Sequence, residues 1–456
     1  MARKSWLAAH GKVAKHIVSI IFLTVVVVSL SAWRDSNGTQ SYEPQRIRLG
    51  ERLFRDQRFT TSKGDLATSC ATCHLFDEDP QGRRAFTDFF NRSWVPFRTS
   101  DPRRTEIRNS PILFDTGLMP QLHFDGEFKS LEELVAATFS GRPMGWLPGE
   151  EEQAFNQVHT VLVQDKGSEG EVSYAEQFKA AFAVELDKLT RDQVIAYVSK
   201  AVADYVRTFR SRQNSPYDQF IKANGLDASP NKGESGKLYG ERMLAKLSEL
   251  ESKNELKLAA GFNRAMLDGY KIFLRGNGNQ SAGNCVACHT PPLFTDLAFH
   301  NKGISQIDYD QINGEGKFAA MEIPNAAKAV RPSAKFRELP ERGRYGVVDL
   351  GHWNFIDLKT SALRRAGESD DQLLRRMIGA FKTPTLRHLA YSEPYFHSGN
   401  VASLENALSE IIRLSEMARA GRIREADEEL LNIRLKEADV APLLAFLNAL
   451  NEELKP

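Results

Sequence analysis

Little in the sequence would place it in a specialised structural class. Only four of the 456 residues are cysteine, the net charge is +1, and charged and hydrophobic residues make up 26% and 41%. This balance excludes disordered, collagen-like and multi-span membrane chains. It also lacks the positive charge that favours nucleic acid, so we expect no nucleic-acid partner. A chain of this length can bury sizeable cores, which predicts two or three domains.

Long apolar runs are equally scarce, and the clearest one lies near the N-terminus. Residues 17–33 are mostly apolar and follow four basic residues, with no acidic residue before them. This arrangement is typical of an export signal and predicts a periplasmic protein. Ser29 and Ser31 offer small residues for cleavage, while the length of the run is also near the minimum for a membrane span. We therefore expect residues 1–34 to be a signal peptide or an N-terminal membrane anchor.

The four cysteines all fall in two Cys-x-x-Cys-His strings, Cys70–His74 and Cys285–His289. Cysteines three positions apart on a helical turn face the same way, so both can reach the vinyl groups of one porphyrin. The histidine that follows can then bind the iron as the proximal ligand. Two disulfides, or one zinc site with four thiolates, are the alternatives, but neither requires the histidines. The strings predict two covalent haem c groups, attached through Cys70, Cys73, Cys285 and Cys288, with His74 and His289 on the irons.

The segments that follow the two strings are similar to each other. Phe86–Asp88 is repeated as Phe294–Asp296, and Asn109–Leu113 corresponds to Lys382–Leu386. In both copies a glycine follows the proline after 15 residues, and a Ser-Leu-Glu string begins four residues later. A repeat without gaps predicts that the haem domain is duplicated within the chain.

The rest of the sequence predicts a mainly α-helical fold. Ser130–Glu133 and Thr190–Gln193 have the spacing of capping boxes, and valines at four-residue steps follow the second. Asp439 is expected to cap a last helix. No pair of alternating segments predicts a sheet. We expect two cytochrome c-like haem domains related by internal duplication, an N-terminal one over residues 35–214 and a C-terminal one over residues 261–456. Residues 215–260 are expected to form a linker with a charged helical insertion.

Together, several strings resemble the bacterial di-haem cytochrome c peroxidase and MauG family. Besides the two haem strings, they are Arg108–Pro111, Phe124–Gly126, Phe299–Asn301, Phe381–Arg387 and Pro394–Gly399. The resemblance implies a peroxide-reacting haem in the N-terminal domain and an electron-entry haem in the C-terminal one. It implies hydrogen peroxide as the oxidant, and either a small periplasmic electron-donor protein or a protein substrate as the partner.

The same resemblance implies a calcium ion between the haems. The positions that match its ligands are Asn109, Ser392 and Pro394. Side-chain and carbonyl oxygens are the ligands that a hard cation needs. An asparagine that only braces a turn is the alternative interpretation.

The face of the N-terminal haem opposite its histidine departs from the family pattern. Cleavage of an O–O bond needs a polar group that moves a proton. The family's Gln and Glu positions hold Leu134 and Met144, which cannot do so. Glu150, with its neighbours Glu151 and Glu152, and His123 are the candidate replacements; the alternative for His123 is a structural role beside an aromatic ring.

The C-terminal haem departs from the pattern as well. The position of its sixth ligand holds Ile411, which cannot bind iron. Met417 on the same predicted helix is a candidate distal ligand, and His300 and His397 are further ones. Helix packing is the alternative role for Met417, and hydrogen bonding at the haem edge is the alternative for the two histidines. The axial ligand matters because it sets the reduction potential.

Two further features bear on function. Phe124 replaces the family's bridging tryptophan, and Trp146 is either its substitute or a core residue. Arginines between residues 83 and 108 are candidates to neutralise the haem propionates. The sequence thus predicts a periplasmic di-haem oxidoreductase that activates hydrogen peroxide at the N-terminal haem. The alternative is a di-haem electron-transfer or sensor cytochrome without peroxidase activity.

Overall fold

The computed structural model describes residues 43–61, 68–74, 77–78, 84–85, 108–168, 170–276 and 281–453. The expected signal or anchor in residues 1–34 lies outside these ranges, as do Phe86–Asp88 and the predicted propionate ligands Arg83, Arg92, Arg98, Arg103 and Arg104; of Arg84 only the backbone is described. Within the described ranges, no helix has both the length and the apolar character needed to cross a bilayer.

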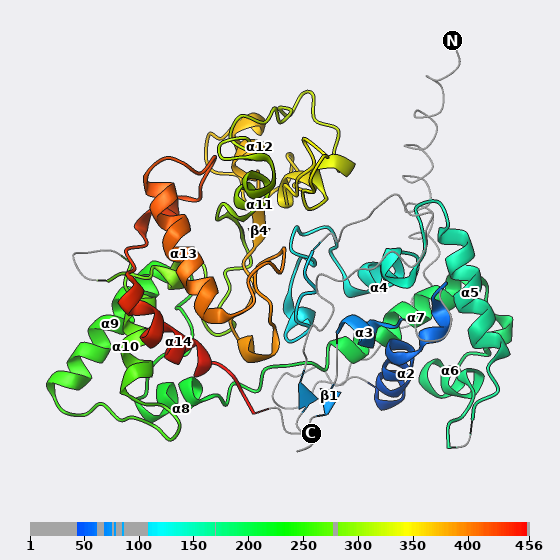
Figure 1. Cartoon of the computed structure of the whole chain (residues 1–456). Helices are drawn as coiled ribbons and strands as arrows, with labels where there is room; N and C mark the ends of the chain where they lie inside the picture. Colours follow the sequence, from blue (N-terminus) through cyan, green and yellow to red (C-terminus); the bar gives the residue numbers. More distant parts are fainter. Residues whose placement is uncertain are drawn as a thin grey trace, which may run out of the picture. The chain divides into compact units, whose positions relative to one another are not determined.

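The N-terminal half is helical, as predicted. Its helices are α2 (Pro44–Arg55), α3 (Cys70–Cys73), α4 (Leu131–Phe139), α5 (Glu151–Gln164), α6 (Tyr174–Phe182) and α7 (Arg191–Val206) (Figure 1). They enclose one hydrophobic core in which α2 packs against α7. Gly50 permits this close crossing, because a Cβ atom there would lie 2.1 Å from the carbonyl oxygen of Ala201.

The C-terminal half repeats this helix crossing. Its helices are α8 (Pro216–Ala223), α9 (Gly236–Ser252), α10 (Arg264–Leu274), α11 (Ile304–Asn313), α12 (Asp370–Arg376), α13 (Leu404–Arg419) and α14 (Val440–Asn448) (Figure 1). Here α10 packs against α14, and a Cβ atom on Gly269 would lie 1.9 Å from the carbonyl oxygen of Pro442. Each half therefore contains a pair of helices that cross closely at a glycine.

The predicted caps differ in how fully they form. Thr190–Gln193 is a complete capping box at the start of α7, with hydrogen bonds in both directions. Ser130 accepts a hydrogen bond from the backbone N–H of Glu133 at 3.2 Å and caps α4. Asp439 occupies the N-cap position of α14, as predicted, but its carboxylate accepts from the Lys436 backbone N–H at 2.8 Å and makes no capping bond to α14.

Short strands are present although no sheet was predicted. β1 (Asp77–Glu78) pairs with β2 (Arg84–Ala85), and β3 (Phe299–Asn301) pairs antiparallel with β4 (Ala380–Lys382). Strands of two or three residues are too short to display the alternation by which strands are recognised. The β3–β4 pair has a consequence for the site, because it places Phe299 opposite Lys382.

The helices between residues 215 and 260 pack into the C-terminal core. Tyr217 and Phe220 of α8 are buried, as are Tyr239, Met243 and Leu247 of the charged helix α9. This segment therefore contributes to the same core as α10 and α14. The stretch between α11 and α12, which has few regular elements, has a separate small core that includes Phe318, Phe336 and Trp353.

Equivalent positions of the two repeat segments, counted from Pro111 and Pro384, share local structure. Asp115 and His388 both have a left-handed backbone, and each is followed by a 3₁₀ turn, Thr116–Leu118 and Leu389–Tyr391. His123 and Phe396 are left-handed as well. An isolated β-bridge closes each segment, between Leu122 and Phe128 and between Tyr395 and Val401. These matches support our proposal that the halves are related by internal duplication.

Candidate haem sites

Both Cys-x-x-Cys-His strings form the same turn. The backbone N–H of His74 donates to the Cys70 carbonyl at 2.9 Å, and that of His289 donates to the Cys285 carbonyl at 2.8 Å. None of the four cysteines, all of which are described, forms a disulfide. Burial raises the pKa of Cys70 and of Cys285 to about 12, so both remain thiols. Each turn thus presents two thiols and a histidine together, as haem attachment requires.

Both histidines are half-buried and neutral, which suits an iron ligand. His289 donates from Nδ1 to the Phe294 carbonyl at 3.0 Å, and burial lowers its pKa to about 3. Burial also lowers the pKa of His74 to about 4, against a hydrogen bond with the Pro111 backbone that raises it. A donor bond from Nδ1 fixes the ring and leaves the Nε2 lone pair for a metal. The residues present therefore fit the proximal side of a haem c.

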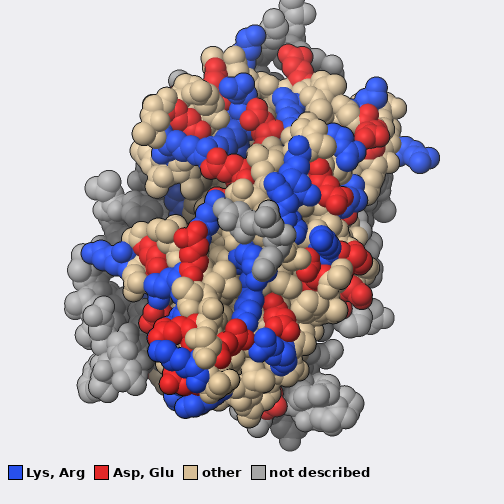
Figure 2. All heavy atoms as spheres, turned by 90° about the vertical axis from the view of Figure 1, so that its left-hand side faces the viewer, with Lys and Arg blue, Asp and Glu red and all other residues tan. Residues whose placement is uncertain are grey.

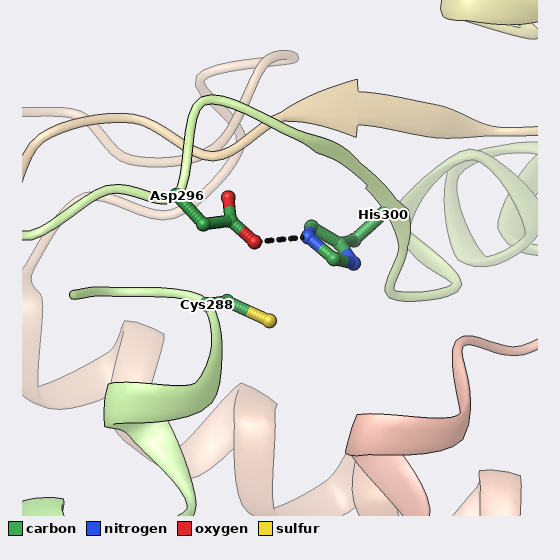
Figure 3. A group of neighbouring side chains, drawn as sticks. All are labelled: Cys288, Asp296 and His300. Carbon is green, nitrogen blue, oxygen red and sulfur yellow. Dashed lines mark hydrogen bonds and ion pairs between the residues drawn. The ribbon is translucent and has the colours of Figure 1, made fainter. Parts of the chain in front are cut away.

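His300 lies beside the second string but does not suit an iron ligand. Its Nε2 meets Asp296 at 2.8 Å and its Nδ1 meets Asp427 at 2.7 Å. Burial would lower the pKa of His300, but hydrogen bonds to the two carboxylates outweigh it and raise the pKa to about 12. The doubly protonated ring has no lone pair to offer. Figure 3 shows Asp296 and His300 facing each other beside the Cys288 sulfur, so this group belongs to the haem site.

The other candidates near the C-terminal haem differ in what they contact. His397 is buried and stacks on Phe381 with 3.6 Å between the ring centroids, and no described residue hydrogen-bonds its Nε2 atom. Met417 is buried, and its sulfur accepts a hydrogen bond from Arg413 at 3.2 Å within α13. Ile411 packs partly buried against the same core. These contacts support a packing role for Met417.

The glutamates that follow the first repeat are engaged in local structure. The Glu150 carboxylate accepts from the Leu147 backbone N–H at 2.9 Å, which closes the turn before α5. Glu151 accepts from Gly149 at 3.0 Å, and Glu152 pairs with Arg191 at 3.3 Å. These contacts support the turn and the first part of α5, so Glu150 gains no support as a proton-transfer group.

His123 is the candidate that the fold brings near the first string. Its positive charge is one of the causes that lower the pKa of His74, which places the two rings within electrostatic reach. The residue has a left-handed backbone, with φ 62°, and its Nδ1 lies 3.3 Å from Glu127. A histidine can move a proton near neutral pH, which the hydrophobic side chains of Leu134 and Met144 cannot.

The two aromatic residues considered for electron transfer, Phe124 and Trp146, lie in different places. The Trp146 indole donates to the Phe59 carbonyl at 3.2 Å and so braces the N-terminal core. Phe124 lies between the halves, where its carbonyl accepts the Lys382 backbone N–H at 2.7 Å. The structure thus places Phe124, and not Trp146, at a contact between the repeats.

The predicted calcium ligands come together in part. The Asn109 side-chain nitrogen donates to the carbonyl of Pro394 at 2.6 Å and to that of Phe396 at 3.2 Å. Its amide oxygen is buried and has no hydrogen-bond partner among the described residues. A half-turn of the amide would bring this oxygen beside the carbonyls, where only a cation could satisfy all of them. The Ser392 hydroxyl bonds to Leu389 within its own turn.

A buried ion network joins the two halves near this point. Arg108 binds Asp349 through Nε at 2.5 Å and Nη2 at 2.9 Å, and Asp125 through Nη1 at 2.7 Å. All three side chains are at most 9% exposed. Arg108 was one of several candidates to neutralise a haem propionate, and its donors are engaged by these two protein carboxylates instead.

Sequence patterns did not identify the partners of Arg108. Asp125 is part of the Phe124–Gly126 string, but the string did not indicate what its side chain binds. Asp349 and His352 lie outside any motif, and only the fold brings them here. His352 donates from Nδ1 to the Asp125 carbonyl at 2.7 Å and stacks on Phe299.

Comparisons with known proteins agree with this arrangement. Residues 44–225 match the family described as di-haem cytochrome c peroxidase. The chain is 25% identical to a cytochrome-c peroxidase, IdrP2, of Denitromonas iodatirespirans, over 89% of this chain and 82% of that protein. It is 23% identical to the methylamine utilization protein MauG of Methylorubrum extorquens, over 90% of this chain and 79% of that protein.

Two solved structures share the fold. The dihaem peroxidase BthA of Burkholderia thailandensis has a TM-score of 0.52 at 16% identity, over 92% of this chain and 89% of that one. A MauG-like protein associated with microbial copper homeostasis has a TM-score of 0.50 at 19% identity, over 91% of both chains. With the two haem-type turns and these relatives, the chain is similar in sequence and fold to the di-haem cytochrome c peroxidase and MauG family and is an enzyme of the di-haem peroxidase type.

Proposed function

We propose that the chain is a periplasmic oxidoreductase with two covalent haem c groups that uses hydrogen peroxide. In this proposal Cys70, Cys73 and His74 would hold the haem that reacts with peroxide. Cys285, Cys288 and His289 would hold the haem that supplies electrons. The observation that carries the proposal is the repeated turn, in which each half presents two thiols beside a half-buried, neutral histidine. The apolar run behind basic residues at the N-terminus supports export.

Each residue near the haems has a defined part. Bound haem would supply the redox chemistry, and the protein tunes access and potential. His289 keeps its ring oriented through the Phe294 carbonyl, and the His300 group holds a half-buried charge beside Cys288. We assign His123 as the group that moves a proton on the N-terminal side, because it lies within electrostatic reach of His74 and its Nδ1 has the Glu127 carboxylate at 3.3 Å as a partner.

The proposal includes a calcium ion held by Asn109 with the carbonyls of Ser392 and Pro394. The buried Asn109 amide oxygen without a described partner supports it. Such an ion would tie the first repeat to the loop of the second. The partner is either a small electron-donor protein or a protein substrate. On the face shown in Figure 2, basic and acidic side chains are interspersed, so this face would not select a partner by net charge alone.

The test is the reaction of the purified holoprotein with hydrogen peroxide, after stepwise reduction of the two haems. Optical and EPR spectroscopy should show that one iron is accessible and that its signal changes on addition of peroxide. Two low-spin haems that remain unchanged by peroxide would favour the alternative, a di-haem electron-transfer or sensor cytochrome. The absence of the family's Gln and Glu, at Leu134 and Met144, is the observation that favours that alternative.

A pair of variants tests the role of His123. His123→Leu removes the only group that we assign to proton transfer, and the peroxide reaction should slow by roughly 100-fold. Glu150→Gln is the matched control, since its carboxylate serves a turn, and the rate should stay unchanged. A larger loss in Glu150→Gln than in His123→Leu would reverse the assignment.

A further inference from the structure

The two repeats contact each other through a reciprocal pair of backbone hydrogen bonds. The backbone N–H of Asn109 donates to the carbonyl of His397 at 2.7 Å, and that of Lys382 donates to the carbonyl of Phe124 at 2.7 Å. Counted from the repeat prolines, Asn109 corresponds to Lys382, and Phe124 corresponds to His397. Each repeat thus donates from one position and accepts at another, as in a twofold interface between identical subunits.

The side chains at these positions continue the correspondence. Asn109 Nδ2 donates to the carbonyl of Pro394 at 2.6 Å, and Lys382 Nζ donates to the carbonyl of Gln121 at 2.7 Å. Pro394 and Gln121 are again equivalent positions. On one side of the pseudo-twofold axis, a carbonyl therefore meets an amide beside the candidate calcium site. On the other side, the equivalent carbonyl meets an ammonium group.

Lys382 keeps its positive charge at neutral pH although burial disfavours that charge. The side chain is partly buried, and the loop that it holds is packed closely: a Cβ atom on Gly126 would lie 2.6 Å from the Phe299 ring. Burial lowers the pKa of Lys382 to about 8, while the charge of Asp125 opposes this effect. The group is therefore mainly protonated at neutral pH, where a cation can satisfy carbonyl oxygens that point toward it.

We propose that Lys382 is a positioning residue. Its ammonium group binds the Gln121 carbonyl in the place that a calcium ion would take at the equivalent loop, and so holds residues 119–126 against the C-terminal half. This loop contains His123 and Phe124. An effect of Lys382 on catalysis therefore rests on the proposed function. The loop of the first repeat carries its own cation in this way and needs no ion. The equivalent loop of the second repeat is held by Asn109, whose amide is uncharged, so a calcium ion would supply the positive charge there.

The first experiment measures bound calcium in the dialysed holoprotein. Lys382→Asn recreates at the first loop the amide found at Asn109, and this variant should bind one more calcium ion per chain than the unmodified protein. Lys328→Met, at an exposed lysine, is the control and should leave the calcium content unchanged. An unchanged calcium content in folded Lys382→Asn overturns the proposal. A wild-type protein without calcium would refute only the Asn109 site, because the expected difference of one ion remains.

The second experiment measures hydrogen exchange of residues 119–126 in the holoprotein. Lys382→Met removes the charge at similar length, and exchange in this loop should quicken by about 10-fold or more, as expected when a local contact worth over 1 kcal/mol is lost. Lys382→Arg retains a cation and should restore much of the protection, while the haem spectra report that both variants are folded. Equal exchange in Lys382→Met and wild type overturns the proposal, as does an arginine variant that exchanges as fast as the methionine variant.

Discussion

Met417 shows how one contact can separate two roles of the same side chain. A thioether can bind haem iron or fill a core, and the residue type alone does not distinguish these roles. In the structure its sulfur accepts a hydrogen bond from Arg413, and the residue is 8% exposed. His300 is a similar case, since both of its ring nitrogens face carboxylates. At both positions the neighbours of the polar atoms, and not the residue type, indicate the role.

We therefore predict that Met417→Leu leaves the C-terminal haem intact. Leucine has a similar volume, so the free energy of unfolding should fall by less than about 1.5 kcal/mol. Redox titration and EPR of the holoprotein are the measurements. A marked fall in the reduction potential of one haem would identify Met417 as its axial ligand after all, because methionine ligation raises that potential.

Pairs of helices, more than single helices, define each half. Gly50 lets α2 cross α7, and Gly269 lets α10 cross α14. These glycines are helical, so their use is the close approach of two backbones and not an unusual backbone angle. The crossing helices of each half carry its core and lie next to the segment that holds its haem string.

The first prediction for these elements concerns the helix crossing. Gly50→Val would push α2 away from α7, because even a Cβ atom meets the Ala201 backbone. The expected loss of stability is about 1–3 kcal/mol or more, from overpacking. Chemical denaturation monitored by circular dichroism measures it. Arg48→Ala, at an exposed position of the same helix, is the control. Equal stability of the two variants would contradict the close crossing.

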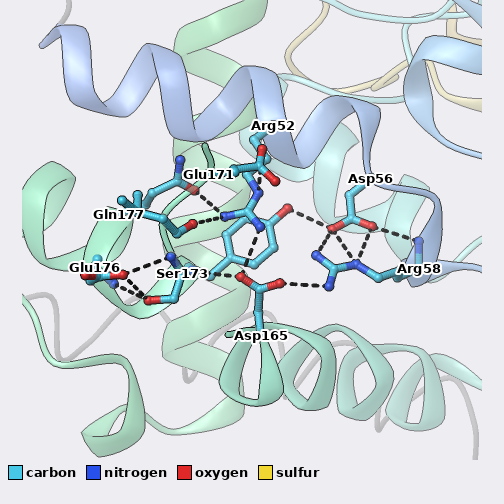
Figure 4. Close-up of polar contacts among 10 residues, drawn as sticks. Arg52, Asp56, Arg58, Asp165, Glu171, Ser173, Glu176 and Gln177 are labelled. Atoms are coloured by element: carbon cyan, nitrogen blue, oxygen red, sulfur yellow. Dashed lines mark hydrogen bonds and ion pairs between the residues drawn. The ribbon is translucent and has the colours of Figure 1, made fainter. Parts of the chain in front are cut away.

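A second prediction concerns the polar cluster that ties α2 to α5 and α6. Figure 4 shows Asp165 between Arg52 and Arg58, at 3.0 Å and 2.8 Å, and the buried ring of Tyr174 lies under the Arg52 guanidinium. Burial alone would raise the pKa of Asp165, but hydrogen bonds from Arg58 and its other partners lower it below the usual value. Asp165→Asn should therefore cost about 1–3 kcal/mol at pH 7.

The pH dependence of this difference checks its electrostatic origin. A depressed carboxyl pKa contributes stability above the unfolded pKa, and this contribution disappears as the pH falls through the folded pKa. The gap between wild type and Asp165→Asn should therefore shrink below about pH 4. Denaturation curves at pH 7, 5 and 3 measure it. A gap that is independent of pH would mean that Asp165 acts through packing.

The whole molecule depends on contacts that join its halves. Arg108 and Asp125 belong to the first half and Asp349 to the second, and all three are buried. Burial would raise the pKa of Asp349, but the charge of Arg108 lowers it below the usual value. The halves are thus connected by Arg108, which pairs with one carboxylate from each half.

Arg108→Met should destabilise the protein by about 3–5 kcal/mol, because it leaves two buried carboxylates without their cation. Thermal and denaturant unfolding of the holoprotein measure the loss. Adding Asp125→Asn and Asp349→Asn to this variant should recover part of the stability, since the uncompensated charges are then gone. If the triple variant is no more stable than Arg108→Met, the loss arises from packing and not from charge.

Much of the local structure could be predicted from the residue order. The haem strings were recognised because attachment needs two thiols and a histidine within one turn, which neighbouring residues supply. The capping box at Thr190 formed for the same reason, since its partners lie three residues apart. Asp439 was the exception, because a competing backbone N–H at Lys436 also lies within its reach.

The sequence by itself determined the two haem-type turns, the repeat, the helical class and the resemblance to the family, because each depends on residues that are close together or evenly spaced. Only the tertiary structure decided which side chains meet between the halves. Asp349 lies 241 residues along the chain from Arg108, and Lys382 lies 261 residues from Gln121. Such pairs depend on the path of the whole backbone, because burial strengthens charge interactions only where folding removes water around both partners.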